Sequence, residues 1–219
     1  MGEWVNLDTH HGVVRAWQAT PEGRPRGGLV VIQEIFGVTA HIRAVAEDYA
    51  AQGYQVLAPA FFDQIEPGLE LDYDGPGTER GRTLIRELGW DKPLEVVQAA
   101  ASRLAPTGRV GTVGYCWGGT VALLAALRLG RPSVSYYGAR NVQFLEETPK
   151  APVLFHFGEH DASIPPEAIA RHRQAWPQAP IHVYPADHAF NRNEGHAYDA
   201  ASATLARQRT LDFLAEHVG

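Results

Sequence analysis

Residues 109–129, RVGTVGYCWGGTVALLAALRL, join a β-prone run to an apolar helical run through a short turn rich in glycine. Residues 109–115 favour a strand, and residues 118–129 favour a helix. The segment GYCWG at 114–118 has the Gly-x-Cys-x-Gly form of a nucleophile elbow, a strained turn that lifts one side chain above a sheet. Cys116, the only cysteine of the chain, then stands at a helix N-terminus, where the helix dipole favours a thiolate. A buried cysteine among small residues is the other interpretation of this stretch.

Strand-like and helix-like segments alternate along the rest of the chain. Short β-branched and apolar runs predict further strands at 28–33, 54–59, 133–138, 151–158 and 181–185. Helical periodicity predicts helices at 39–52, 78–88, 91–104, 165–176 and 200–218. This alternation predicts an α/β fold with a mostly parallel central sheet and helices on both faces. Its ligand site is expected at the carboxyl ends of the strands.

Several local signals refine these boundaries. Thr39 and Asp91 are the side chains expected to cap two of the helices. Residues 60–77 are rich in proline, glycine and acidic residues, so we expect a long surface excursion there rather than a linker between domains. Such excursions often cover active sites.

Composition limits the class of protein and its partners. The chain has 219 residues, of which 45% are hydrophobic and 20% charged, so we expect a single globular domain over residues 1–219. One cysteine forms no internal disulfide, and neither a signal peptide nor an apolar run long enough for a membrane is visible. A net charge of −6 without a basic cluster argues against nucleic acid. We therefore expect a cytoplasmic protein with a small-molecule partner, monomeric or, alternatively, a homodimer.

Two loop residues can complete a catalytic group with the cysteine. Asp161 follows the predicted strand that ends at Gly158, and His188 follows the next predicted strand. The order nucleophile, acid and histidine is that of α/β-hydrolases. In that arrangement His188 would take the thiol proton, and Asp161 would hold the imidazole in the correct tautomer.

Motifs across nearly the whole chain resemble one family. They are QEIFG at 33–37, GYCWGG at 114–119, GEHD at 158–161, DHAF at 187–190 and ARQRTLDFL at 206–214. Together they resemble the dienelactone hydrolase (carboxymethylenebutenolidase) family of α/β-hydrolases, in which a cysteine replaces the usual serine. The resemblance implies hydrolysis of a lactone or a small carboxylic ester without a cofactor. It also implies dienelactone, an intermediate of chlorinated aromatic breakdown, as the best-defined substrate.

The resemblance also assigns roles close to the thiol. The matching glutamate, Glu34, would help remove the thiol proton when substrate arrives; a surface glutamate is the other interpretation. The backbone N–H groups of Ile35 and Trp117 would form the oxyanion hole.

Substrate-binding residues are also implied by the resemblance. Arg82, in ERGR at 79–82, matches the family's carboxylate-binding arginine, although a solvated helix arginine is the alternative. Phe36 and Tyr137 would line an apolar pocket, or belong to the core. Ala189 stands where the family has a serine that also binds the carboxylate, which weakens the expectation of narrow dienelactone specificity.

Other interpretations remain open at this point. A broader carboxylesterase or thioesterase acting on neutral esters is favoured by Ala189, and a non-catalytic binding protein or thiol redox sensor is the rival from another class. We expect no metal site, because His156 and His160 span a strand end rather than one helix face. His10 and His11 are expected in a surface turn.

Overall fold

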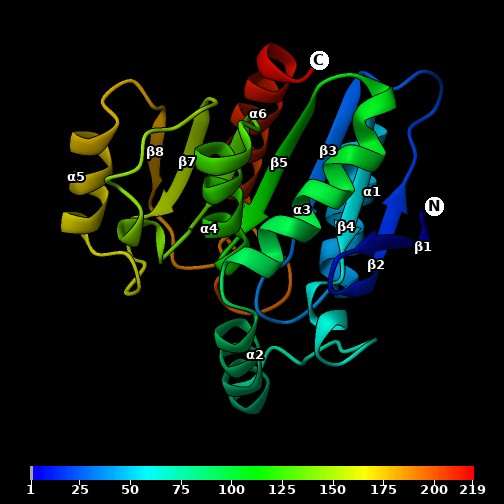
Figure 1. Ribbon diagram of the computed structural model, residues 1–219. Coiled ribbons are helices and arrows are strands. Elements are labelled where there is room, and N and C mark those ends of the chain that lie inside the picture. The colour runs from blue at the N-terminus through cyan, green and yellow to red at the C-terminus, as the bar shows by residue number, and fades with distance from the viewer. Residues whose placement is uncertain (1) are drawn as a thin grey trace.

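The computed structural model describes residues 2–219 and places eight strands in one sheet (Figure 1). The strand order is β1-β2-β4-β3-β5-β6-β7-β8. Strands β3 to β8 run parallel to one another, whereas β2 pairs antiparallel with both β1 and β4. The strands are β1 Gly2–Thr9, β2 Gly12–Ala19, β3 Gly27–Ile32, β4 Tyr54–Pro59, β5 Val110–Tyr115, β6 Ser133–Tyr136, β7 Val153–Gly158 and β8 Ile181–Tyr184. The predicted mostly parallel α/β sheet is confirmed.

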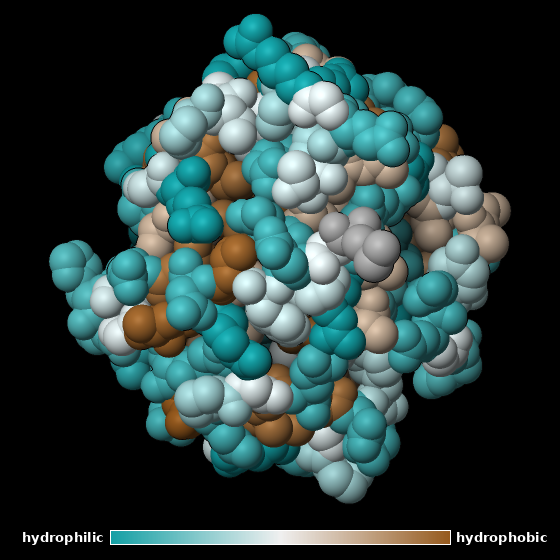
Figure 2. Space-filling view, turned by 90° about the vertical axis from the view of Figure 1, so that its right-hand side faces the viewer, coloured by the Kyte–Doolittle hydropathy of each residue, from teal (hydrophilic) through white to brown (hydrophobic). Residues whose placement is uncertain are grey.

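The antiparallel hairpin β1–β2 is the part of the sheet that sequence analysis did not assign. His10 and His11 form the turn between its strands, as expected. Only part of each strand is buried, and the sequence accordingly lacks a regular alternation of apolar and polar residues, which is the signal that predicts a strand. Trp4 packs edge to face on Trp17, with ring centroids 5.5 Å apart. The side of the molecule on which β1 and β2 lie is mostly hydrophilic, with small apolar patches (Figure 2).

Helices lie on both faces of the sheet, with α3 and α4 on one face and α1 and α6 on the other (Figure 1). On β7, Phe155 and Phe157 contact His172 of α5, whereas His156 between them bonds Thr210 of α6. Successive side chains of a strand point to opposite faces, so α5 and α6 cover opposite faces as well. The helices are α1 Ala40–Ala51, α2 Gly75–Leu88, α3 Asp91–Leu104, α4 Trp117–Leu124, α5 Pro166–Ala175 and α6 Ala200–His217. Shorter turns are η1 Phe61–Gln64, η2 Ala105–Thr107, the π-turn η3 Ala125–Leu129 and η4 Asn141–Gln143.

Helix caps agree with the sequence in one case and differ in another. The Thr39 hydroxyl accepts from the backbone N–H of Ile42, which confirms the predicted cap of α1. The predicted capping role of Asp91 is wrong, because Trp90 occupies the N-cap position without a side-chain bond and Asp91 lies within the first turn. There its charge still complements the helix dipole.

The predicted excursion is shorter than residues 60–77 and partly buried. Helix α2 already begins at Gly75, because Asp74 caps it and Pro76 is well tolerated in a first turn. Phe61 of η1 is fully buried and packs against Trp117. Asp63 pairs with Arg15 of β2 at 2.8 Å. Helix α2 lies beyond the carboxyl ends of the strands (Figure 1).

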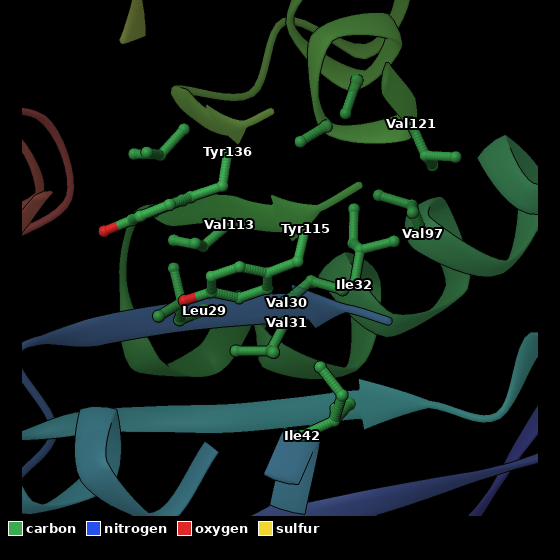
Figure 3. Packing of buried hydrophobic residues seen from close by; sticks show 14 of the residues in the cluster. Leu29, Val30, Val31, Ile32, Ile42, Val97, Val113, Tyr115, Val121 and Tyr136 are labelled. Atoms are coloured by element: carbon green, nitrogen blue, oxygen red, sulfur yellow. The ribbon is translucent and has the colours of Figure 1, made fainter. Parts of the chain in front are cut away.

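The central strands carry apolar side chains on both faces, and this anchors the middle of the sheet. All four residues from Leu29 to Ile32 of β3 are fully buried. Tyr115 at the end of β5 packs against Tyr136 at the end of β6, with ring centroids 4.8 Å apart (Figure 3). The strand ends that hold the loops around Cys116 are therefore fixed by close packing. None of the helices within residues 2–219 has the length and apolarity that a bilayer span requires.

Candidate active site

The turn between β5 and α4 holds Cys116 in a strained conformation. Its backbone has φ 55° and ψ −118°, in a region that L-residues rarely adopt. A Cβ on Gly114 would collide with the carbonyl of Gly118, and a Cβ on Gly118 would collide with the backbone of Ile32 and Gln33. The missing side chains thus let the first turn of α4 lie directly against β3 and β5. This is the local geometry of a nucleophile elbow.

Replacement of Gly114 by alanine is expected to destabilise the protein by more than about 2 kcal/mol, because the added methyl group meets backbone that cannot move aside. Urea unfolding followed by circular dichroism measures this loss. The matched control is Gly75→Ala, where nothing lies within 4 Å of the added Cβ. That variant is expected to be unchanged or slightly more stable. Equal stability of the two variants would contradict the steric argument.

Asp161 and His188 lie in the loops that follow β7 and β8, and they contact each other directly. The distance from His188 Nδ1 to Asp161 Oδ2 is 2.6 Å. The Asp161 side chain is fully buried, while 27% of the His188 side chain is exposed. The other carboxylate oxygen of Asp161 accepts the backbone N–H of Ser163 at 2.8 Å. A buried carboxylate held at both oxygens fixes the plane and the tautomer of the imidazole.

The electrostatics link His188 to the cysteine. Burial lowers the pKa of His188, but the negative charge of a Cys116 thiolate and the hydrogen bond to Asp161 outweigh it, and the pKa of His188 is raised well above its ordinary value. The ring of His188 also packs against the ring of Tyr137, with centroids 5.0 Å apart. The imidazolium form of His188 is therefore the one that this environment stabilises.

Glu34 is buried and has a partner that sequence analysis missed. Its side chain is 2% exposed, and one carboxylate oxygen lies 3.3 Å from Nη1 of Arg192. The Arg192 guanidinium stacks on the ring of Tyr73 at 4.2 Å and lies 5.6 Å from the ring of Phe36. The only signal in the sequence is that Arg192 lies four positions after His188, in the same loop.

A cavity of about 420 Å³ brings most of the predicted residues together. Its lining is Glu34, Ile35, Phe36, Thr78, Arg82, Ile85, Cys116, Trp117, Ala139, Arg140, Ser163, Asp187, His188, Ala189, Arg192, His196 and Ala197. Buried Asp161 lies behind His188 rather than on the cavity wall. A larger groove of about 860 Å³ lies between α6 and the starts of β7 and β8, and it contains none of the predicted site residues.

The remaining predicted residues differ in their access to this cavity. Arg82 lines it from α2, but its side chain is 58% exposed and pairs with Glu79 at 2.7 Å. Tyr137 is fully buried and lies outside the lining, against His188. As the first residue of α4, Trp117 has an N–H without an intrahelical acceptor, and Ile35 follows β3 on the facing wall.

The residues 2–219 contain no group of three or more His, Cys, Asp or Glu side chains suited to a metal ion. Both ring nitrogens of His156 are engaged, with the Tyr184 hydroxyl at 2.8 Å and with Thr210 at 3.0 Å. Burial, with smaller contributions from His182 and Arg209, lowers the pKa of His156 well below its ordinary value. His156 is thus a neutral core residue bridging β7, β8 and α6.

The sheet order, the elbow in the centre of the sheet and the loops that gather at the strand ends define this protein as an α/β-hydrolase.

Comparison with known proteins gives the family. The model of the dienelactone hydrolase family matches residues 14–218. A carboxymethylenebutenolidase of Pseudomonas putida is 33% identical over 230 aligned positions, which cover 97% of this chain and 96% of the relative. Carboxymethylenebutenolidase 1 of Cupriavidus pinatubonensis is 32% identical over 198 positions, 85% of each chain. A crystal structure from Klebsiella pneumoniae, assigned only provisionally as a dienelactone hydrolase, has a TM-score of 0.83 at 30% identity and covers 99% of this chain and 98% of its own. The chain belongs to the dienelactone hydrolase family and is a hydrolase that acts on esters or lactones.

Proposed function

We propose that this hydrolase opens lactones and cleaves small carboxylic esters through a covalent thioester on Cys116, with His188 and Asp161 as its proton-transfer pair. The observation that carries the proposal is the 2.6 Å contact between Asp161 and His188 beside a cysteine held in a strained elbow. Strained backbone at a non-glycine residue is typical of functional sites. A buried structural cysteine would need neither the strain nor the imidazole.

The chemistry follows from these positions. His188 takes the proton of the Cys116 thiol and becomes the imidazolium, and the thiolate attacks the carbonyl carbon. The negative charge that develops on the carbonyl oxygen is met by the N–H groups of Trp117 and Ile35. The C–O bond of the ester then breaks, and the leaving oxygen takes a proton from the His188 imidazolium. Water next gives a proton to His188 and attacks the thioester, which breaks the C–S bond and restores the thiolate. No cofactor takes part in this sequence.

Glu34 fits a role that depends on the substrate. In this structure its carboxylate is held by Arg192, so it can act on the Cys116 thiol only when that ion pair loosens. A polar group of the substrate that competes for the Arg192 guanidinium would free Glu34 beside the thiol. Dienelactone, a lactone that carries a carboxylate, is the substrate that we propose first.

The test is hydrolysis of a small panel by freshly reduced protein, followed by mass spectrometry of the trapped intermediate. A lactone is expected to add its whole mass to Cys116, because its leaving oxygen stays tethered to the acyl group. A p-nitrophenyl ester is expected to add only its acyl mass. Reduced protein that hydrolyses no member of the panel would contradict the proposal and favour a binding or thiol redox-sensing role.

A broader activity on neutral esters is the second candidate, and two observations favour it. Ala189 offers no hydroxyl to a substrate carboxylate, and Arg82 is exposed and already paired with Glu79. Turnover of a carboxylate-bearing lactone against its methyl ester distinguishes the two candidates. Preference for the neutral compound would support the broader esterase or thioesterase.

A further inference from the structure

Three arginines line the cavity at Cys116, and they differ in whether a carboxylate is paired with them. Arg192 is paired with the buried carboxylate of Glu34, and Arg82 is paired with Glu79 on α2. Arg140 is half-buried, and within residues 2–219 its side chain forms no ion pair with an Asp or Glu. Arginine stays protonated at every relevant pH. The cavity thus presents one cation whose charge no protein carboxylate neutralises.

The position of Arg140 in the fold indicates which half of a substrate the Arg140 side chain would contact. Arg140 follows β6, and Ser163, also on the cavity wall, follows β7. Both lie on one side of Cys116, which follows β5, whereas Glu34 and Ile35 follow β3 on the other side. Neighbouring strands are about 4.8 Å apart, so these two walls are separated across the cysteine.

The reaction geometry assigns the two walls to different atoms of the substrate. The carbonyl oxygen must approach the N–H groups of Ile35 and Trp117, on the β3 side. The leaving oxygen must approach His188, whose loop follows β8 on the same side of Cys116 as β6. A group that extends from the leaving oxygen therefore passes toward the wall formed by Arg140 and Ser163.

From this arrangement we infer that Arg140 is a specificity-determining residue that binds a carboxylate on the leaving-group half of the substrate. The inference rests on the proposed function and narrows it to esters and lactones whose alcohol portion is anionic. A planar carboxylate can take two parallel N–H bonds from the Arg140 guanidinium, and no ion pair within residues 2–219 has to break first. In a chain of net charge −6, this unpaired cation also favours the entry of an anion at this wall.

The test compares 4-acetoxybenzoate with its methyl ester, two aryl acetates that differ in the charge of the leaving group. The quantity measured is the ratio of kcat/KM for the anionic to that for the neutral compound, in wild type and in variants, because their intrinsic reactivities cancel in this comparison. Arg140→Gln is expected to lower the ratio by about 10- to 100-fold, as for the loss of one charge-assisted pair. Arg140→Lys is expected to keep part of the preference, because it retains the charge but loses the planar fork.

Two further variants make the outcome decisive. Arg173→Gln on α5 removes the same charge from an exposed position outside the cavity, and its ratio is expected to stay within about twofold of wild type. Any of three outcomes would overturn the inference: an unchanged ratio in Arg140→Gln, an equal loss of kcat/KM on both esters, or loss of the preference in Arg82→Gln instead. Hydrolysis of the methyl ester by wild type separates the two hypotheses: if it occurs, the proposed function stands whatever Arg140 does, and if neither ester is hydrolysed, both fail.

Discussion

Replacement of Cys116 by alanine is expected to lower kcat/KM for lactones and esters by at least about 10⁴-fold, with no loss of the fold. The large factor is expected because a nucleophile and its base act as a unit, and loss of the nucleophile removes nearly all of their contribution. Alanine accepts the φ of 55° as poorly as cysteine does, so the strain at this position is unchanged and stability should remain close to wild type. Initial rates and thermal unfolding of the same preparation measure both quantities.

The chain offers an internal control for this prediction, because Cys116 is its only cysteine. Alkylation of the reduced wild type by iodoacetamide is therefore expected to give one adduct and the same loss of activity as the alanine variant. A substrate present during alkylation should protect the thiol. If the alanine variant keeps more than a tenth of the wild-type rate, the nucleophile must be another group.

Backbone strain in the molecule is concentrated around this thiol. Only three non-glycine residues among those described have positive φ, namely Cys116, Tyr137 and Ala189. Cys116 is the elbow residue, Tyr137 packs against the ring of His188, and Ala189 directly follows His188. Conformations of this kind cost of order 1–3 kcal/mol each, so they persist only where tight surroundings hold them. Their gathering around Cys116 and His188 supports the same site that the hydrogen bonds indicate.

The sequence could predict those parts of the site that depend on strand ends. Parallel strands bring their carboxyl ends to one edge, so a cysteine after β5, an aspartate after β7 and a histidine after β8 are expected at the same edge of the sheet. The contact between Glu34 and Arg192 has no such rule behind it. It joins residues 158 positions apart, and Arg192 lies in a loop without periodicity. Loop conformation depends on packing that no local pattern encodes.

The same contrast, between segments with a clear sequence pattern and segments without one, explains where the predicted and the observed fold differ. The fully buried strand β3 has a continuous apolar run, and its position was predicted. The hairpin β1–β2 is partly exposed on both faces, so its pattern resembles that of a loop. Arg82 shows what the sequence leaves open for binding residues: the resemblance implies a carboxylate contact, whereas the pairing of Arg82 with Glu79, one turn earlier, is visible only in the structure.

Asp161→Asn is expected to lower kcat by about 10²- to 10⁴-fold while leaving the protein folded. The asparagine oxygen can still accept the backbone N–H of Ser163, so the loop is retained. The ring of His188, however, loses the carboxylate that holds its Nδ1–H and helps to raise its pKa. The control is Asp187→Asn, since Asp187 accepts the backbone N–H of His188 rather than a ring proton. Its loss is expected to be less than about fivefold.

The pH dependence of stability gives Asp161→Asn a second readout that a purely structural carboxylate would not produce. The pKa of His188 is raised in the folded protein, so protonation of His188 stabilises the fold. This contribution is fully present below about pH 6.5, the value of an unpaired histidine, and is lost as the pH rises through the raised pKa of the folded state. The difference in unfolding free energy between wild type and Asp161→Asn should therefore be largest on the acidic side of that window and shrink above it. The range to measure is pH 5.5 to 9, from about one unit below the free histidine value to well above it. If the difference in unfolding free energy does not change over this range, and the rate is near normal, the acid of this site lies elsewhere.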